Sequence, residues 1–209
     1  MMGLGVFLLD LISPFMEAIA PIIPGEFFPY FFSMELFQRA LLAAVLVTIV
    51  AGILGTYLLI QHLALIGDGL AHVSFGGVAV GIVLGATSPL WYALVFSITA
   101  AILIHEMQSR EMLTGDASIA IFLTGMLALG LVILRLGGGG ITTDIEGYLF
   151  GNLLLIDGPS LDLIAVICVL SIIVLAFLRT GLLAVTIDPV AARIQGLPVQ
   201  NIGLLFSIT

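Results

Sequence analysis

The chain has 209 residues, of which 61% are hydrophobic and only 9% are charged. A soluble domain carries about 25% charged residues because its surface faces water, so this composition excludes an ordinary soluble globule. The formal net charge is −8, with five arginines and no lysine. That balance argues against nucleic acid as a partner, since its binding depends on cations that neutralise phosphates. We therefore expect a membrane protein, with lipid covering most of its surface.

The first 33 residues are apolar but repeatedly interrupted. Asp10, Glu17 and Glu26 break the apolar pattern, as do four prolines, and no cationic region precedes it as in a signal peptide. We interpret residues 1–33 as an interfacial or re-entrant segment rather than a full span. Residues 34–209 then form one transmembrane domain with short connections.

Apolar stretches long enough to cross a membrane follow this segment. A spanning helix needs about 20 apolar residues, and it must be helical because lipid offers the backbone no hydrogen-bond partners. Five stretches qualify: Leu41–Ile60, Leu70–Ala86, Pro89–Ile104, Ala117–Leu134 and Leu161–Leu178. A sixth is expected to begin at Ile202. The predicted fold class is therefore all-α, a polytopic transmembrane helix bundle with five to six spans besides the N-terminal segment.

Small residues in the second stretch indicate close helix packing. Gly77, Gly81 and Gly85 recur every four residues, a spacing that lets helix backbones approach each other. We expect packing, rather than ligand binding, to be their role.

Asp68 and His72 at the start of the second stretch are candidate metal ligands. They are four residues apart, so a helix places them on one face. Ionisable groups at a span are costly and tend to face a bundle interior or an aqueous path. A carboxylate with an imidazole suits zinc, manganese or iron, although two ligands are too few for a closed site. The alternative is that Asp68 caps the helix and His72 forms a hydrogen bond within the bundle.

Two enzyme signatures fail in this chain. His105 and Glu106 begin like the zinc protease motif H-E-x-x-H, but Ser109 occupies the last position. Glu106 and Arg110 are predicted instead to form an ion pair one helical turn apart. The phosphate-binding loop of ATPases needs a lysine, and the chain has none. We expect a transport subunit rather than an enzyme, with any ATP hydrolysis on a separate chain.

The stretch Asp188–Pro198 is the longest polar segment between spans. An Asp cap, Pro189 at the first helical position and Gly196 as a stop predict a short helix of about two turns. Arginine placement puts this loop on the cytoplasmic side, where such a helix could dock another protein. The alternative is an ordinary connector.

Four segments, in chain order, resemble the permease subunits of zinc and manganese ABC importers. They are Phe37–Leu84, which contains I-G-D-G-L-A-H, then Asp116–Ile121, Tyr148–Asn152 and Asp188–Pro198. Together they cover about residues 35–200. Chains of that family continue for two or three more spans, so we expect this permease domain to be truncated at its C-terminus.

The resemblance implies a function, a set of partners and two groups of site residues. It implies an ATP-driven importer of a divalent metal, zinc or manganese, in which this chain forms the translocation path. The implied partners are a cytoplasmic ATP-binding subunit, a second permease copy in a homodimer and an extracellular metal-binding protein. No cofactor is implied on this chain beyond the transported metal, since ATP belongs to the partner. The implied site residues are Asp68 and His72 for the metal, and Asp188, Pro189, Arg193 and Gly196 in a helix that couples to the ATPase. The alternative function is a secondary transporter driven by an ion gradient.

Overall fold

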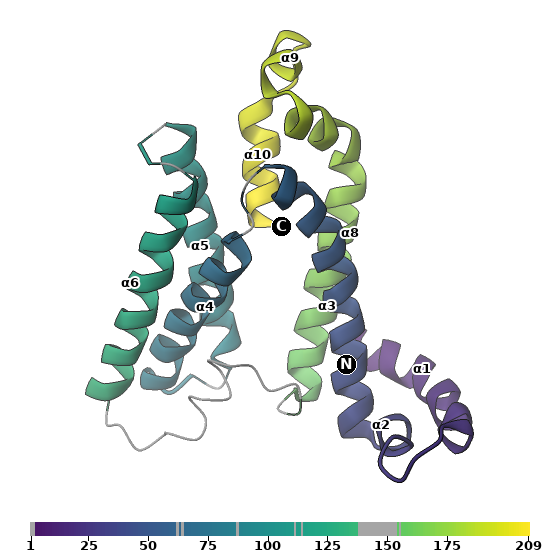
Figure 1. The fold of residues 1–209 in the computed structure, drawn as a ribbon. Coiled ribbons are helices and arrows are strands. Elements are labelled where there is room, and N and C mark those ends of the chain that lie inside the picture. The colour runs from purple at the N-terminus through teal and green to yellow at the C-terminus, as the bar shows by residue number, and fades with distance from the viewer. Residues whose placement is uncertain are drawn as a thin grey trace. The chain divides into compact units, whose positions relative to one another are not determined.

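The computed structural model describes residues 3–61, 63, 65–86, 88–110, 112–113, 115–137, 154 and 156–209. All the regular elements within these ranges are helices (Figure 1). In chain order they are α1 (Leu4–Ile19), the 3-10 turn η1 (Ala20–Ile22), α2 (Tyr30–Ser33), α3 (Glu35–Ile60), α4 (Ile66–Val83), α5 (Leu90–Ser109), α6 (Gly115–Leu136), α8 (Gly158–Ile187), α9 (Pro189–Ile194) and α10 (Val199–Ile208). The predicted all-α class is confirmed. The Tyr148–Asn152 motif lies outside the described residues.

Six helical segments of the described chain are long and apolar enough to cross a membrane. Five of them, α3, α4, α5, α6 and α8, overlap the five predicted spans, so the polytopic bundle is confirmed. The spans predicted as Leu70–Ala86 and Pro89–Ile104 each extend slightly beyond their helices, α4 and α5. The sixth is Leu4–Ile22, which we interpreted as interfacial or re-entrant. Length and composition do not separate these possibilities, and that interpretation stays a prediction. The expected start at Ile202 falls inside α10, Val199–Ile208, and the sixth span stays a prediction.

The helices form two compact units, each described by itself. The first, here called the α1 unit, comprises Met1–Ile53 and Gly151–Val174, and the second, the α4 unit, comprises Leu54–Phe150 and Leu175–Thr209. The core of the α1 unit is a cluster in which α1, α3 and α8 meet. Its buried members are Leu9, Leu42, Ala43 and Leu161.

Within the α4 unit, α4 packs against α5 on one side and α6 on the other. Glycines make both contacts close. A Cβ at Gly77 would lie 2.6 Å from the Tyr92 carbonyl oxygen of α5, and one at Gly69 would lie 2.6 Å from Ile119 Cγ2 of α6. The packing role of Gly77 is thus confirmed. Gly85 differs, because it follows the end of α4 with a φ of 69°, a left-handed conformation that glycine adopts without strain.

Candidate metal pair and docking helix

Asp68 lies in the first turn of α4. The N-cap position is held by Leu65, whose side chain makes no capping hydrogen bond, so Asp68 is not the capping residue. A carboxylate in a first turn is nevertheless stabilised by the positive end of the helix dipole. A negative charge on Asp68 is thereby favoured at the N-terminal end of α4.

Asp68 and His72 face each other on one side of α4. His72 Nε2 lies 3.8 Å from Asp68 Oδ1, and the two side chains are 26% and 63% exposed, respectively. Zinc binds nitrogen ligands at about 2.0–2.1 Å and oxygen ligands at about 2.0–2.2 Å, so the two bonds together span up to about 4.3 Å. One ion can therefore contact both atoms at the observed separation. The predicted shared face is confirmed, while metal binding stays a prediction.

The pair is only part of a coordination shell. Among the described residues, no group of three or more His, Cys, Asp or Glu side chains is placed to hold a metal ion. Asp68 lies on a side of α4 that carries other exposed positions, Gly67 and Ala71. The faces packed on α5 and α6 are, by contrast, buried. Further ligands would therefore have to approach this open side.

The predicted short helix is present as α9, Pro189–Ile194. Asp188 is its N-cap, and its Oδ1 accepts hydrogen bonds from the amides of Val190 at 3.0 Å and Ala191 at 2.9 Å. Pro189 occupies the first helical position, where its missing amide hydrogen costs nothing. Asp188 and Pro189 thus have the local roles that the sequence predicted.

The C-terminal end of α9 is capped as well as its N-terminal end. Gly196 has a φ of 82°, and its amide donates to the Arg193 carbonyl at 3.1 Å, while the Leu197 amide donates to the Ala192 carbonyl at 3.1 Å. These two bonds define a Schellman motif, which requires a left-handed residue that glycine supplies without strain. The predicted stop at Gly196 is confirmed.

The surface of α9 is exposed and largely apolar. Val190 and Ile194 are 68% and 82% exposed, as is Ile187 just before the helix at 73%, whereas Ala192 is buried beneath them. Arg193 is also exposed. A rigid, capped helix that presents apolar side chains beside a cation suits contact with another protein.

The α4 unit also contains a polar cavity of about 530 Å³ that the sequence patterns did not predict. Amide and hydroxyl side chains line it together with His105 and Arg193. Gln61 Nε2 donates to Thr186 Oγ1 at 2.9 Å, and His105 Nδ1 lies 3.5 Å from Ser207 Oγ. The signal that could have revealed it is the placement of polar residues at the ends of three helices. Gln61 directly follows α3, and His105 and Thr186 lie in the last turns of α5 and α8.

At the end of α5, Arg110 Nε lies 2.5 Å from Glu106 Oε1. The predicted ion pair is confirmed. Because Glu106 pairs with this arginine one turn later, it takes the structural role expected once the protease motif fails.

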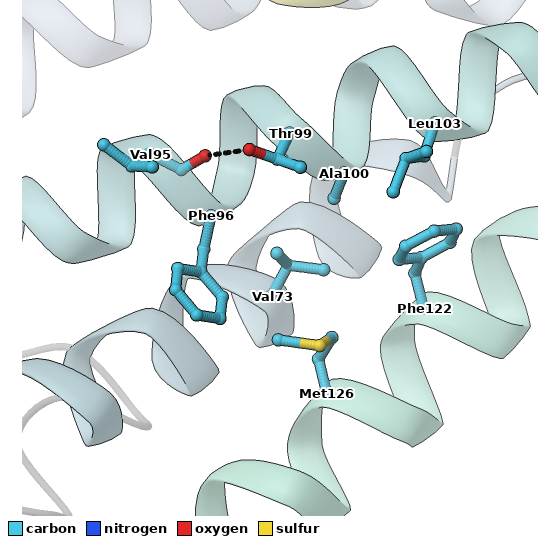
Figure 2. A pocket seen from close by; sticks show the side chains of 8 residues that line it. All are labelled: Val73, Val95, Phe96, Thr99, Ala100, Leu103, Phe122 and Met126. Carbon is cyan, nitrogen blue, oxygen red and sulfur yellow. Dashed lines mark hydrogen bonds between the residues drawn. The ribbon is translucent and has the colours of Figure 1, made fainter.

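A second cavity, of about 240 Å³, lies where α4, α5 and α6 meet. Figure 2 shows Val73 of α4 and Met126 of α6 converging with Phe96 of α5. Thr99 is the only hydroxyl among the lining side chains, and it donates to the Val95 carbonyl of its own helix at 2.7 Å. This cavity is therefore apolar and offers little to a hydrated ion.

Known proteins bear on both the fold and the motifs. The family model described as the ABC 3 transport family matches residues 33–209. The chain belongs to this family. The family match and a manganese transport relative described below confirm the resemblance of this ABC 3 chain to permease subunits of metal ABC importers. The chain is a multi-pass protein of the plasma membrane.

Individual relatives of this ABC 3 chain agree with the family match. It is 33% identical over 170 residues to an uncharacterized membrane protein of Synechocystis sp., covering 81% of this chain and 60% of that protein. It is 31% identical over 182 residues to the manganese transport system membrane protein MntC of Halalkalibacterium halodurans, covering 87% of this chain and 62% of that one. The chain therefore spans less than two thirds of the length of these curated relatives.

A solved structure gives the same result. The complex of PsaBC from Streptococcus pneumoniae with a Fab contains a chain that matches with a TM-score of 0.66 and 27% sequence identity. The match covers 83% of this ABC 3 chain and 63% of that chain. The helical arrangement is thus one already seen in a protein of known structure.

Proposed function

We propose that this chain is the membrane-spanning permease subunit of an ATP-driven importer of a divalent metal, zinc or manganese. The observation that carries the proposal is the Asp68–His72 pair, 3.8 Å apart on the open side of α4, in a chain of the ABC 3 transport family. The relative from Halalkalibacterium halodurans, described as a manganese transport protein, supports manganese as one cargo.

In the proposed transport cycle, Asp68 and His72 hold the ion transiently along the translocation path. A second permease copy, forming a homodimer around that path, would face the open side of α4, and water would complete the coordination shell. Partial ligation by one chain favours release, because fewer protein bonds must break before the ion leaves. An extracellular metal-binding protein would deliver the ion to this path.

The ATP-binding subunit would dock on α9. Its exposed Val190 and Ile194 supply apolar contact area, Arg193 supplies a charge for orientation, and the caps at Asp188 and Gly196 keep the helix rigid. Rigid docking matters because a helix that frays under load would absorb the movement of the ATPase instead of transmitting it.

Contacts within the α4 unit offer a route from α9 to the metal pair. The end of α9 leads into α10, and a Cβ at Gly203 of α10 would lie 2.8 Å from His105 Cε1 on α5. The other end of α5 presses on α4 through Tyr92 and Gly77. Close backbone and side-chain contacts of this kind transmit displacement because packed protein atoms are hard to compress. We propose that ATPase movement reaches Asp68 by this route.

The metal role is tested by uncharged substitutions of similar size at Asp68 and His72, made in the full-length protein with its partners. Asp68→Asn and His72→Gln, singly and together, should abolish uptake of radioactive manganese or zinc while the ATPase still co-purifies. Ser74→Ala is the matched control on α4, since the Ser74 hydroxyl donates only to the Ala71 carbonyl of its own helix at 2.7 Å. Normal uptake by the double variant would refute the site.

The energy source is tested separately. Purified permease in vesicles, without the ATPase, should not accumulate metal under either a proton or a sodium gradient. Accumulation under these conditions would support the alternative, an ion-gradient-driven secondary transporter in which Asp68 and His72 carry protons.

A further inference from the structure

Helix α1 has three distinct faces along its length. The side chains of one face pack on the protein, those of the second are apolar and exposed, and those of the third are polar. The packed face consists of Leu9, Ile12 and Met16. The exposed apolar face consists of Phe7, Leu11 and Phe15, and the polar face consists of Asp10, Ser13 and Glu17. The exposed face recurs every four residues, as an amphipathic helix requires, with Phe7, Leu11 and Phe15 exposed by 56%, 66% and 68%.

A membrane-spanning placement fits α1 poorly. The apolar segment Leu4–Ile22 has its midpoint near residue 13, so Asp10 would lie close to the middle of the bilayer. An acidic side chain at that depth costs about 2.5–3.5 kcal/mol on insertion scales, and Glu17 adds a second charge. Figure 1 also shows α1 crossing α3 rather than running along it. Because α3 is a spanning helix, a helix that crosses it runs closer to the membrane plane.

The start of α1 is fixed to the beginning of α8. A Cβ at Gly5 would lie 2.5 Å from the Leu161 carbonyl oxygen, so only glycine lets the two backbones approach this closely. The Val6 amide donates to Asp162 Oδ1 at 2.8 Å. Both contacts fall within the first turns of α8, Gly158–Ile187, which places α1 at the end of a spanning helix and not at its centre.

The other attachment uses a buried amide near the beginning of α3. Gln38 is only 2% exposed. Its Oε1 accepts from Ser13 Oγ at 2.9 Å, and its Nε2 donates to the Phe32 carbonyl at 2.7 Å. Gln38 lies within the first turn of α3, which begins at Glu35. The amide thus ties α1 and the segment before α3 to the same end of the α1 unit.

The segment between α1 and α3 presents a cluster of exposed aromatic rings. Phe27, Phe28, Tyr30 and Phe31 are 75%, 64%, 51% and 42% exposed. Tyrosine is enriched at membrane–water interfaces, and phenylalanine is typical of the apolar face of interfacial helices. Exposed apolar area of this size marks an interaction surface, and it adjoins the apolar, membrane-spanning part of α3.

We propose that residues 4–33 form an anchor lying in the membrane interface, with Phe7, Leu11 and Phe15 directed into the acyl-chain boundary. The aromatic segment extends the same contact, while Asp10 and Glu17 stay at the polar level. The first 34 residues contain no lysine or arginine, so attachment rests on buried apolar area and not on attraction to anionic lipid. The partner is a lipid surface, and this inference does not depend on which ion the protein transports.

Depth measurements on the full-length protein in phosphatidylcholine vesicles test the anchor. In a Cys168→Ala background, single cysteines at Phe7, Leu11 and Phe15 would carry spin labels, whose depth follows from collisions with oxygen and with a water-soluble nickel complex. An in-plane helix gives three equal, shallow depths. A spanning helix gives a change of about 12 Å across eight residues at 1.5 Å per residue.

The matched control uses the same spacing on a spanning helix. Labels at Val45, Ile49 and Ile53 of α3, which are 48%, 49% and 40% exposed, should show the full depth gradient. The proposal is overturned if the α1 labels follow that gradient, or if they are reached by nickel and not by oxygen, as they would be in water. Depths that stay constant when vesicle lipid is made anionic or the salt is raised would further support apolar attachment.

Discussion

Gly203 of α10 lies directly against His105 of α5, so that a Cβ at position 203 would stand 2.8 Å from His105 Cε1. Ser207, one turn later on α10, places its Oγ 3.5 Å from Nδ1 of the same ring. The contact joins the helix that follows α9 to a helix that packs on α4. We therefore expect a larger side chain at position 203 to change both the stability of the protein and the proposed coupling between α9 and α4.

Gly203→Val should therefore push the His105 ring away from α10, because the added carbon meets the end of that side chain. Overpacking costs up to about 1–3 kcal/mol, so the thermal unfolding midpoint in detergent should fall. If the proposed coupling route is right, metal-stimulated ATPase activity of the assembled transporter should fall as well. Gly125→Val is the control, because a Cβ there meets nothing within 4 Å. Equal unfolding midpoints and equal ATPase activities in the two variants would contradict the importance of the Gly203–His105 contact.

Gly77→Val should disrupt the contact between α4 and α5. The obstacle is the Tyr92 carbonyl oxygen, which would lie 2.6 Å from the valine Cβ; it belongs to the backbone and cannot rotate away. We expect a loss of about 1–3 kcal/mol, measured as a lower unfolding midpoint. Gly67→Val on the same helix meets nothing within 4 Å and should leave the midpoint nearly unchanged. A similar loss in both variants would contradict the packing explanation, because helix propensity alone favours valine over glycine.

Asp188→Ala should fray the start of α9, because the amides of Val190 and Ala191 would lose their acceptor. Removing an N-cap costs about 0.5–2 kcal/mol. Hydrogen exchange of these two amides, followed by mass spectrometry, should become faster. Asp188→Ser keeps an oxygen at the cap and should retain most of the protection. Unchanged exchange in the alanine variant would show that α9 does not depend on its cap.

Asp157, just before α8, should make stability depend on pH. The hydroxyl and then the amide of Ser160 hold the pKa of the Asp157 carboxyl below its usual range, and Ser160 N lies 2.9 Å from Oδ1. A lowered pKa in the folded state stabilises the protein above the unfolded pKa of about 3.9, and this contribution is lost as pH falls through the folded value.

The corresponding measurement compares unfolding midpoints across pH. Asp157→Asn should lower the midpoint relative to the wild type at pH 7, and the difference should shrink as the pH falls below about 4. A difference that stays constant with pH would mean that the charge of Asp157 contributes nothing. Ser160→Ala should also lower the unfolding midpoint at pH 7, because it removes the hydroxyl that favours the Asp157 carboxylate.

Local patterns predicted the elements of this chain well. The short helix from Pro189 to its stop at Gly196 followed from an Asp cap, a proline and a glycine, all of which act within a few residues. The Glu106–Arg110 pair and the shared face of Asp68 and His72 followed from the helical repeat alone. The same local reasoning assigned Gly85 to packing and made Asp68 a possible helix cap, and both assignments differ from the structure. The reason is that α4 begins at Ile66 and ends at Val83, so Asp68 lies inside its first turn and Gly85 lies beyond its end.

The sequence by itself thus determined that the chain is a membrane-spanning helical protein with Asp68 and His72 on one face of a helix and with a capped helix outside the spans. These features depend on composition and on intervals of three to four residues. Only the tertiary structure decided that Gly203 meets His105, that Gln38 joins Ser13 to the Phe32 carbonyl, and that α1 crosses α3. Such contacts join residues up to about a hundred positions apart, and in an apolar sequence many pairings bury similar area. Their choice rests on shape and on individual hydrogen bonds, which no local pattern records.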